Sequence, residues 1–344
     1  MPSLKDVARE AKVSPSTVSA VINQQNCVKF STRERVLNAI EKLGYTPNFS
    51  ARELVTNKKQ SIGFLLIPYE NEQTNLFRNS PNSLYDIAMQ DYINDIAQYF
   101  GNNHYSLLLE RFPFFEDSPD LPKMVRQNRV NAMFVAGSLY SRNLITRLKE
   151  HVDIIVAVGC SVSNADYVCN NYTESVAEAI EYLIQRGHRR IAYVEGDIAS
   201  DARPKKQFGY ELALQRNGIP YDPSLVFQSK ILVSSGYEVA QRIWSLEEHP
   251  TAVFFGSDAI AIGAYQFFYD HGVKIPEDIS VMGYENLIVS GFLQPPLTTV
   301  ELYKREMAYE ACRVMMQNLN ERSEKPVGIV ISTSIVERSS VRTL

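Results

Sequence analysis

The stretch SPSTVSAVIN, Ser14 to Asn23, decides the first part of the fold. Ser14 followed by Pro15 is typical of a helix start, because the hydroxyl caps free backbone N–H groups and proline needs no hydrogen bond there. Val18, Val21 and Ile22 share one face at helical spacing, so the stretch predicts a helix over Pro15–Ile22. Its other face carries short hydroxyl side chains in place of Lys and Glu.

Two further helices flank this one. Leu4, Val7, Ala8 and Ala11 share a helical face before it. A capping box of Ser31 and Glu34 and a terminating Gly44 predict a third helix after it. Two helices joined by a short turn and backed by a third predict a helix-turn-helix, whose second helix enters the DNA major groove. A three-helix interaction bundle with a polar surface is also compatible with the pattern.

The charge distribution favours the DNA-binding interpretation. Residues 1–60 hold ten Lys or Arg against five Asp or Glu, a net charge of +5, whereas the remaining residues hold 25 against 34, a net charge of −9. A basic segment on an acidic body suggests that the segment binds a polyanion.

The chain from Ile62 onward alternates short apolar runs with amphipathic helices. Runs such as IGFLLI, AMFVAG, IIVAVG, RIAYVEG and AVFFGSD read as strands of parallel sheets covered on both faces. A single sheet with so many strands would be unusually wide. The sequence therefore predicts two doubly wound α/β halves with a ligand cleft at the carboxyl ends of their strands.

Several classes of protein are not supported. The N-terminus lacks the apolar run of a signal peptide and no window is apolar enough to span a membrane, so we expect a cytoplasmic protein with no membrane partner. We expect neither a metal site, a cofactor nor an enzyme, since the five histidines have no motif partners and no GxSxG, Walker or HExxH motif occurs. The four cysteines lack metal-ligand spacing and are expected to be buried thiols: Cys27, Cys160, Cys169 and Cys312.

The N-terminal residues resemble a known family. LKDVAREAKVSPSTVSAVIN and VKFSTRERVLNAIEKLGYTPNFSARELVTNKKQSIGFLLI are similar to the N-terminal module of the LacI/GalR bacterial transcription regulators. The resemblance implies a DNA-binding domain over residues 1–46 and a hinge helix and linker over 47–60. It implies that the hinge helix, Asn48 to Val55, inserts Leu54 into the minor groove. The expected DNA-binding residues are Ser14, Ser16, Thr17, Ala20, Asn23, Tyr45, Arg52 and Leu54.

One departure from the family concerns base recognition. The seventh residue of the recognition helix is often Arg in the family and is Ala20 here. Alanine makes no bidentate contact to guanine and at best packs on a thymine methyl group. We therefore expect base recognition to depend on Ser16, Thr17 and Asn23, although a packing or phosphate contact is equally compatible with Thr17.

The resemblance extends over the rest of the chain. GHRRIAYVEG, SDAIAIGAYQFFYDHGVKIPEDISVMGY and PPLTTVEL are similar to signatures around a periplasmic-binding-protein-like core. The core over residues 61–344 is expected to have an N-subdomain of 61–159 and 292–322 and a C-subdomain of 160–291 and 323–344. The chain would cross three times between them, and the crossings would act as hinges.

The effector positions implied by the resemblance differ in chemistry from the family. Lys206 occupies a position that is usually Arg, Glu285 one that is commonly Asp, and Asn170 the Asp of a strand-end DN pair. Lys206 and Glu285 could hold a sugar between them or form a structural salt bridge. Asp258 could line the site or cap the helix that follows it. The complete expected set is Ile67, Asn170, Lys206, Ile231, Ser257, Asp258, Glu285 and Lys304.

The resemblance implies a repressor that binds a palindromic operator as a homodimer. Its affinity for double-stranded operator DNA would be controlled by a small molecule, which we expect to be a sugar or sugar phosphate. Open alternatives are a nucleobase corepressor, control by a protein partner, or a sugar-binding protein without a regulatory role. The polar segment 69–84 could be a lid over the cleft or an inert insertion.

Overall fold

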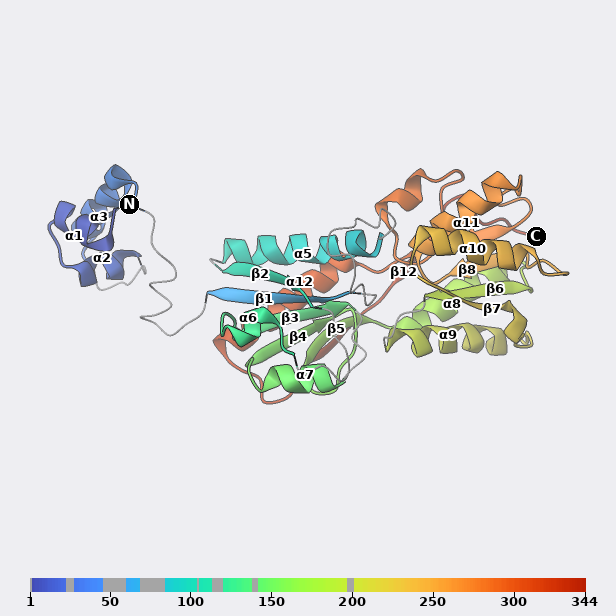
Figure 1. Cartoon of the computed structure of the whole chain (residues 1–344), viewed down its shortest axis with the longest axis horizontal. Helices are drawn as coiled ribbons and strands as arrows, with labels where there is room; N and C mark the ends of the chain where they lie inside the picture. Colours follow the sequence, from blue (N-terminus) through green and yellow to red (C-terminus); the bar gives the residue numbers. More distant parts are fainter. Residues whose placement is uncertain are drawn as a thin grey trace. The chain divides into compact units, whose positions relative to one another are not determined.

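The computed structural model divides the chain into two units, Met1–Gln60 and Ser61–Leu344 (Figure 1). It describes residues 2–22, 28–45, 60–68, 84–103, 105–112, 120–137, 142–196 and 201–344. The predicted hinge helix 48–55 and the segment 69–83 lie outside these residues.

The described residues of the first unit form three short helices, α1 (Leu4–Glu10), α2 (Pro15–Ile22) and α3 (Phe30–Leu43). The predicted bounds of α2 are confirmed. Gly44 ends α3 with φ 59°, a left-handed conformation that glycine adopts without steric cost. The core is formed by buried side chains from all three helices and from Tyr45: Val7, Ala8, Ala11, Val18, Val21, Val36, Ala39 and Tyr45.

The predicted capping box at the start of α3 is wrong. The helix begins at Phe30 with Lys29 as its N-cap residue, and no side chain makes a capping hydrogen bond there. Ser31 and Glu34 therefore both lie within the helix. The actual capping box occurs at α1, where Ser3 Oγ accepts from the Asp6 N–H and Asp6 Oδ2 accepts from the Ser3 N–H.

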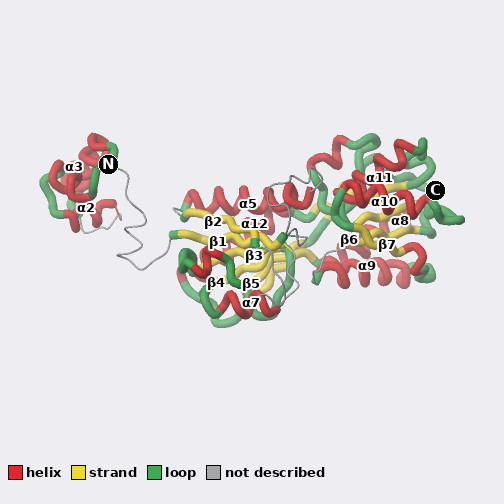
Figure 2. Tube along the Cα trace, viewed as in Figure 1, coloured by secondary structure: helices red, strands yellow, loops and turns green. Residues whose placement is uncertain are grey.

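A six-stranded parallel sheet forms the first half of the second unit, in the order β11-β5-β4-β3-β1-β2. Figure 2 labels β1 to β5 of this sheet. Its strands are β1 (Ser61–Ile67), β2 (Ser106–Arg111), β3 (Ala132–Gly137), β4 (Ile154–Val158), β5 (Asp166–Asn170) and β11 (Gly328–Ile331). Helices α5 (Leu84–Asn102) and α12 (Lys304–Asn320) pack on one face, and α6 (Lys123–Arg126) and α7 (Arg142–Lys149) on the other. Central strands such as β3 are apolar throughout because both faces are covered.

A four-stranded parallel sheet forms the second half, in the order β7-β6-β8-β9. Its strands are β6 (Ile191–Gly196), β7 (Val226–Ser229), β8 (Ala252–Phe255) and β9 (Ser280–Met282). Helices α8 (Tyr172–Gln185) and α9 (Ala202–Arg216) cover one face, and α10 (Val233–Trp244) and α11 (Asp258–Asp270) the other. The second unit therefore has the two doubly wound parallel sheets that the sequence predicts.

The boundary between the two halves differs from the one expected at residue 160. β5 pairs with β4, and β11 pairs with β5, so residues 166–170 and 328–331 belong to the six-stranded sheet. Strands β5 and β11 lie in this sheet because their backbone N–H and C=O groups need a neighbouring strand as hydrogen-bond partner. The chain leaves or enters this half after β5, before α12 and after β11. Two short strands near the last two crossings, β10 (Thr299–Glu301) and β12 (Ser334–Val336), pair antiparallel.

The described residues also bear on the cysteines, on membrane-spanning helices and on metal sites. Cys160, Cys169 and Cys312 are buried free thiols, as expected, whereas Cys27 is outside the described residues. None of the helices described here has the length and hydropathy needed to cross a membrane. Within the same residues, no group of three His, Cys, Asp or Glu is arranged to hold a metal ion.

Candidate DNA-binding and ligand-binding sites

Three hydroxyl groups gather at the start of α2. Ser14 Oγ lies 2.7 Å from Ser16 Oγ and 2.8 Å from Thr17 Oγ1, and it accepts a 3.2 Å hydrogen bond from the Thr17 N–H. Ser14 and Ser16 are exposed, while Thr17 is half-buried. The cluster satisfies part of the helix N-terminus and leaves hydroxyl donors and acceptors facing solvent.

The same hydroxyl groups line a recess of about 480 Å³ that also includes cationic side chains of α3 and its N-cap. Lys29 and Arg35 bring positive charge to this recess, which the sequence analysis did not include. The helical spacing of Thr32 and Arg35, both outside the apolar face of α3, is the signal that could have found them. The recess is lined by Val13, Ser14, Ser16, Thr17, Ala20, Val28, Lys29, Thr32 and Arg35.

The remaining predicted DNA-binding residues differ in their surroundings. Ala20 lines the recess and is half-buried, so its methyl group forms part of an apolar floor. Tyr45 is only 9% exposed and packs in the core of the first unit, so the structure gives its ring a packing role. Asn23, Arg52 and Leu54 lie outside the described residues.

In the second unit, Lys206 of α9 reaches the carboxyl end of β8. Its Nζ donates a 2.9 Å hydrogen bond to the Gly256 carbonyl oxygen and lies 4.2 Å from the centroid of the Tyr284 ring. The Tyr284 hydroxyl is held in turn by Ser175, 3.0 Å away. These contacts fix the ammonium group while leaving donor capacity, because Lys carries three N–H donors.

Glu285 is also held at the carboxyl end of β8, by a hydrogen bond from Ser257. Ser257 caps α11, and its Oγ donates a 2.8 Å hydrogen bond to Glu285 Oε2. Glu285 has φ 110°, which is costly for a residue with a side chain and persists only where the surroundings impose it. The carboxylate is therefore positioned by Ser257 at a strained turn.

Lys206 and Glu285 do not form the structural salt bridge that the sequence left open. Each is bound to another group, the Gly256 carbonyl for Lys206 and the Ser257 hydroxyl for Glu285, and no ion pair links the two. Gly256 and Ser257, the two residues that follow β8, thus hold the Lys206 ammonium group and the Glu285 carboxylate separately. This arrangement can contact a ligand that offers one acceptor and one donor.

Asp258 is held inside the second unit by hydrogen bonds, and its place in the effector site stays a prediction. It is fully buried and accepts hydrogen bonds from the Leu287 N–H, the Ser290 hydroxyl and the Thr299 hydroxyl, at 2.9, 2.6 and 2.6 Å. The alternative role as helix cap is wrong, since Ser257 is the N-cap residue. Burial raises the pKa of Asp258 to about 6, against the lowering effect of the three donors.

Asn170 joins the three crossings between the halves. It ends β5, and its Nδ2 donates 3.0 Å hydrogen bonds to the carbonyl oxygens of Leu302 and Ile331, which lie next to the other two crossings. The side chain is buried. The amide nitrogen of Asn170 is therefore held by backbone, whereas its Oδ1 is buried and has no hydrogen-bond partner among the described residues.

The last three predicted effector residues are also buried. Ile67 ends β1, and Ile231 packs against Gly196 at the end of β6. Lys304 begins α12, and its Nζ lies 3.9 Å from Asp91 Oδ2 in a weak ion pair. The structure thus brings Lys206, Ser257 and Glu285 together, while the other predicted side chains make buried hydrogen bonds, apolar packing contacts or a weak ion pair.

Glu195 is a buried acid near these residues that was not among the residues predicted from the sequence. It lies in β6, is only 4% exposed, and accepts hydrogen bonds from the Tyr193 hydroxyl and the Gly196 N–H. Burial raises its pKa, while the positive charge of Lys206 opposes that rise. The signal in the sequence was an acidic residue ending the apolar run IAYV.

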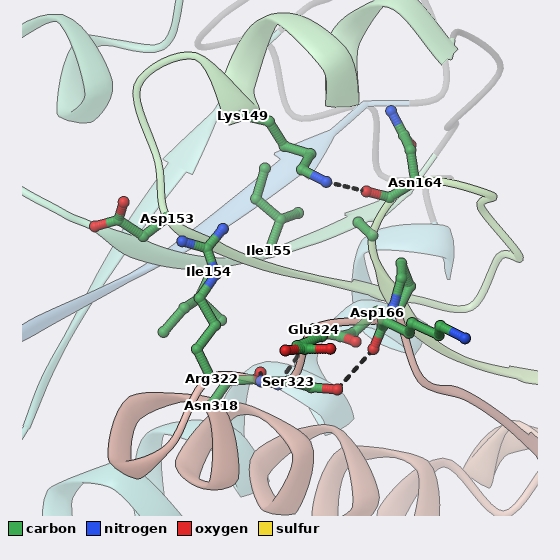
Figure 3. Close-up of a pocket in the computed structure, with 13 residues that line it drawn as sticks. Lys149, Asp153, Ile154, Ile155, Asn164, Asp166, Asn318, Arg322, Ser323 and Glu324 are labelled. Atoms are coloured by element: carbon green, nitrogen blue, oxygen red, sulfur yellow. Dashed lines mark hydrogen bonds between the residues drawn. The ribbon is translucent and has the colours of Figure 1, made fainter.

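A second recess lies at the opposite end of the six-stranded sheet, near the amino ends of β4 and β5 (Figure 3). It measures about 350 Å³ and includes Lys149, Asp166 and Asn318. Asp166 there accepts from Asn318 Nδ2 at 3.1 Å and from the Val327 N–H at 2.7 Å, so it fastens the end of α12 to the sheet. Ligands of doubly wound sheets bind at the carboxyl ends of strands, where Lys206 and Glu285 lie.

Comparison with known proteins matches both units. Residues 3–48 match the model of the family "Bacterial regulatory proteins, lacI family", and residues 180–341 match "Periplasmic binding protein-like domain". The chain is 33% identical over 348 residues to the HTH-type transcriptional repressor PurR of Vibrio atlanticus (strain LGP32), covering 100% of both chains. It is 30% identical over 351 residues to the repressor of the same name from Histophilus somni (strain 129Pt), again covering 100% of both.

Solved structures share the fold. The lac repressor dimer bound to operator and the anti-inducer ONPF matches with a TM-score of 0.82 and 23% identity, covering 99% of each chain. The transcriptional regulator CelR-cellobiose complex matches with a TM-score of 0.70 and 24% identity, covering 99% of this chain and 100% of that one. The chain therefore belongs to the lacI family of bacterial regulatory proteins, as a transcriptional repressor with a helix-turn-helix unit and a periplasmic-binding-protein-like core for a small-molecule effector.

Proposed function

We propose that this repressor binds a palindromic operator as a homodimer and that its effector is a nucleobase, contacted by Lys206 and Glu285. The observation that carries the proposal is the separate anchoring of one cationic donor and one anionic acceptor beside Gly256 and Ser257. A nucleobase edge with adjacent C=O and N–H groups offers one partner to each.

The DNA part of the proposal rests on the first unit. The hydroxyl groups of α2 can approach base edges closely, while Lys29 and Arg35 supply positive charge for the phosphate backbone. We infer that Ser16 and Thr17 contact the operator and that Ala20 packs against an apolar group such as a thymine methyl. Asn23, Arg52 and Leu54 remain predicted contacts on the basis of the family resemblance.

The homodimer is supported by two considerations. A single helix-turn-helix unit makes few DNA contacts, and a twofold pair of units matches a palindromic operator. The second unit also exposes apolar side chains, with Ile288 78% and Phe292 79% exposed on the short helix η2 (Ile288–Phe292). Large apolar groups that are exposed to this extent favour a protein interface.

The choice of a nucleobase replaces the sugar that we expected from the sequence. The relatives with 30–33% identity over the full length carry the name PurR, whereas the solved structures with cellobiose or ribose are only 24% and 20% identical. Lys206 is a point donor and lacks the planar fork with which Arg spans vicinal hydroxyl groups. Both features favour a ligand with one strong acceptor beside one N–H donor.

A sugar is the second candidate, since solved proteins of this fold are described in complex with cellobiose and with ribose. Thermal unfolding of the full-length protein with nucleobases, sugars and sugar phosphates separates the two. A ligand that binds only the native state raises the unfolding temperature in proportion to its concentration over its Kd. Stabilisation by a nucleobase and not by sugars is expected, and the reverse would overturn the assignment.

Operator binding is tested in the same preparation. Fluorescence anisotropy with a set of labelled palindromic duplexes is expected to show a preferred sequence, bound with a steep salt dependence. The stabilising nucleobase is expected to change that affinity. Equal affinity for every duplex, with and without the ligand, would contradict the proposed repressor mechanism.

A further inference from the structure

We propose that Glu195 selects among ligands by requiring an N–H-rich group, such as an exocyclic amino or a protonated amine, next to its carboxylate. This inference rests on the proposed nucleobase effector and names the chemical feature that the effector carries. Glu195 has no assigned role in the family resemblance or in the comparisons.

The position of Glu195 connects it to the ligand-binding residues. It precedes Gly196 at the carboxyl end of β6, and β6 is the immediate neighbour of β8 in the sheet. A Cβ atom placed on Gly256 would lie 3.1 Å from Glu195 Oε1, so the carboxylate folds over the end of β8. The same Gly256 offers its carbonyl oxygen to Lys206.

The hydrogen-bond partners of Glu195 are neutral. Oε2 accepts from the Tyr193 hydroxyl and Oε1 accepts from the Gly196 N–H at 2.8 Å. No described cation forms an ion pair with this carboxylate, and Lys206 and Arg203 act on it only through longer-range charge. Glu195 is thus a buried acid with acceptor capacity left and no cation in contact.

A buried carboxylate without a paired cation is destabilised by desolvation, which raises the pKa of Glu195. A ligand that brings N–H donors to this position supplies the missing partner. A ligand with only a carbonyl oxygen or a hydrogen there leaves the carboxylate with its two neutral donors alone. Selection therefore arises because an added hydrogen bond to a buried charged acceptor contributes more than one between neutral groups.

The test uses two probes that differ by one amino group, hypoxanthine and guanine, titrated into the full-length protein by calorimetry. Wild-type protein is expected to bind guanine at least about tenfold more tightly, since hydrogen bonds to charged groups contribute that much. Glu195→Gln keeps the shape but loses the charge, and its preference is expected to fall to within about threefold. Glu238→Gln, on the exposed face of α10, is the matched control and is expected to keep the wild-type preference.

A second variant covers the case in which Glu195→Gln does not fold. Tyr193→Phe removes one neutral donor from Glu195 while keeping the aromatic ring that stacks on Tyr210 and Phe254. Its preference for guanine is expected to increase about threefold over wild type, because one carboxylate oxygen loses its internal partner.

The outcomes separate this inference from the proposed function. Equal binding of both probes by the wild type, or a preference that neither variant changes, would overturn the role of Glu195 and leave a nucleobase effector in place. If no nucleobase binds while a sugar does, the proposed effector class itself fails. A preference lost in Glu195→Gln and increased in Tyr193→Phe supports the inference.

Discussion

The two polar surfaces of this repressor are built in different ways. The hydroxyl cluster of the first unit comes from four consecutive residues at the start of α2, Ser14 to Thr17, and two of its three hydroxyl-bearing residues are exposed. The proposed ligand-binding residues of the second unit come from α9, from the turn after β8 and from the turn after β9. A local cluster follows from helix geometry, whereas the second cluster exists only once four strands have paired.

This difference has an energetic counterpart. Among the described residues, the first unit has a core of eight buried side chains, whereas the second has four larger clusters around its two sheets. A small core tolerates little loss, because each buried side chain is a large share of its stability. Variants that change one surface at a time distinguish the contributions of the two.

The largest expected effect is on the core of the first unit. Val18 is fully buried between the three helices, so Val18→Asn places an amide there with no available partner, at a cost of roughly 2–5 kcal/mol. We expect operator affinity to fall by more than about 100-fold in fluorescence anisotropy. Ligand-induced stabilisation of the second unit should stay at the wild-type level, and a parallel loss of ligand binding would show that the units are not energetically separate.

The next effect is a pH dependence of stability due to Asp258. Its pKa is about 6 in the folded protein against an ordinary value of 3.8, so the folded state holds the proton more tightly than the unfolded state. This contribution is therefore full below about pH 4 and is lost as the pH rises through 6, amounting to about 3 kcal/mol.

Asp258→Asn removes the titration, and the difference in unfolding free energy between wild type and variant is expected to change over pH 4–7. Denaturant unfolding at four pH values measures it. A difference that stays constant over this range would show that Asp258 has an ordinary pKa in the folded protein.

A smaller effect is expected from Glu285 on the ligand side. Glu285→Gln keeps a partner for Ser257 but removes the negative acceptor, so nucleobase affinity should fall about tenfold to thirtyfold by calorimetry. Glu277→Gln, at an exposed position before β9, is the control. Equal affinities in the two variants would exclude Glu285 from the binding site.

The smallest expected effect concerns the recess beside α2. Arg35→Ala should weaken operator binding about threefold to tenfold and reduce the slope of log affinity against log salt by about one, as for a lost phosphate contact. Lys42→Ala removes a cation that is already paired with Glu10, 2.6 Å away, and is expected to change the slope less. Equal slopes in both variants would place Arg35 outside the DNA contact.

Much of the fold could be predicted from residue patterns. The bounds of α2, the end of α3 at Gly44 and the apolar strands of both sheets follow from hydrophobic periodicity and helix-terminating residues. The predicted start of α3 was wrong by two residues, Ser31 against Lys29 as the N-cap residue, since a capping pattern of Ser and Glu occurs also within helices. The assignment of β5 and β11 failed because parallel pairing depends on partners far away in the sequence.

In the candidate ligand site, the sequence indicates which residues matter, but their hydrogen-bond partners depend on the tertiary structure. Lys206 and Glu285 were identified by their positions, but whether they pair with each other or with other groups depended on the packing of α9 against β8. The sequence allowed Asp258 to contact a ligand as well, but the tertiary structure brings donors from Leu287, Ser290 and Thr299 to its carboxylate. Glu195 was not identified because a single acidic residue in an apolar run has no spacing signature.

The sequence by itself determined the helix-turn-helix, the alternation of strands and helices, and the segregation of charge, since these depend on residues within one or two turns of each other. Tertiary structure alone decided which buried acids are saturated and which retain acceptor capacity. The physical reason is that satisfaction of a buried polar group depends on donors contributed by distant segments, and no local pattern specifies them.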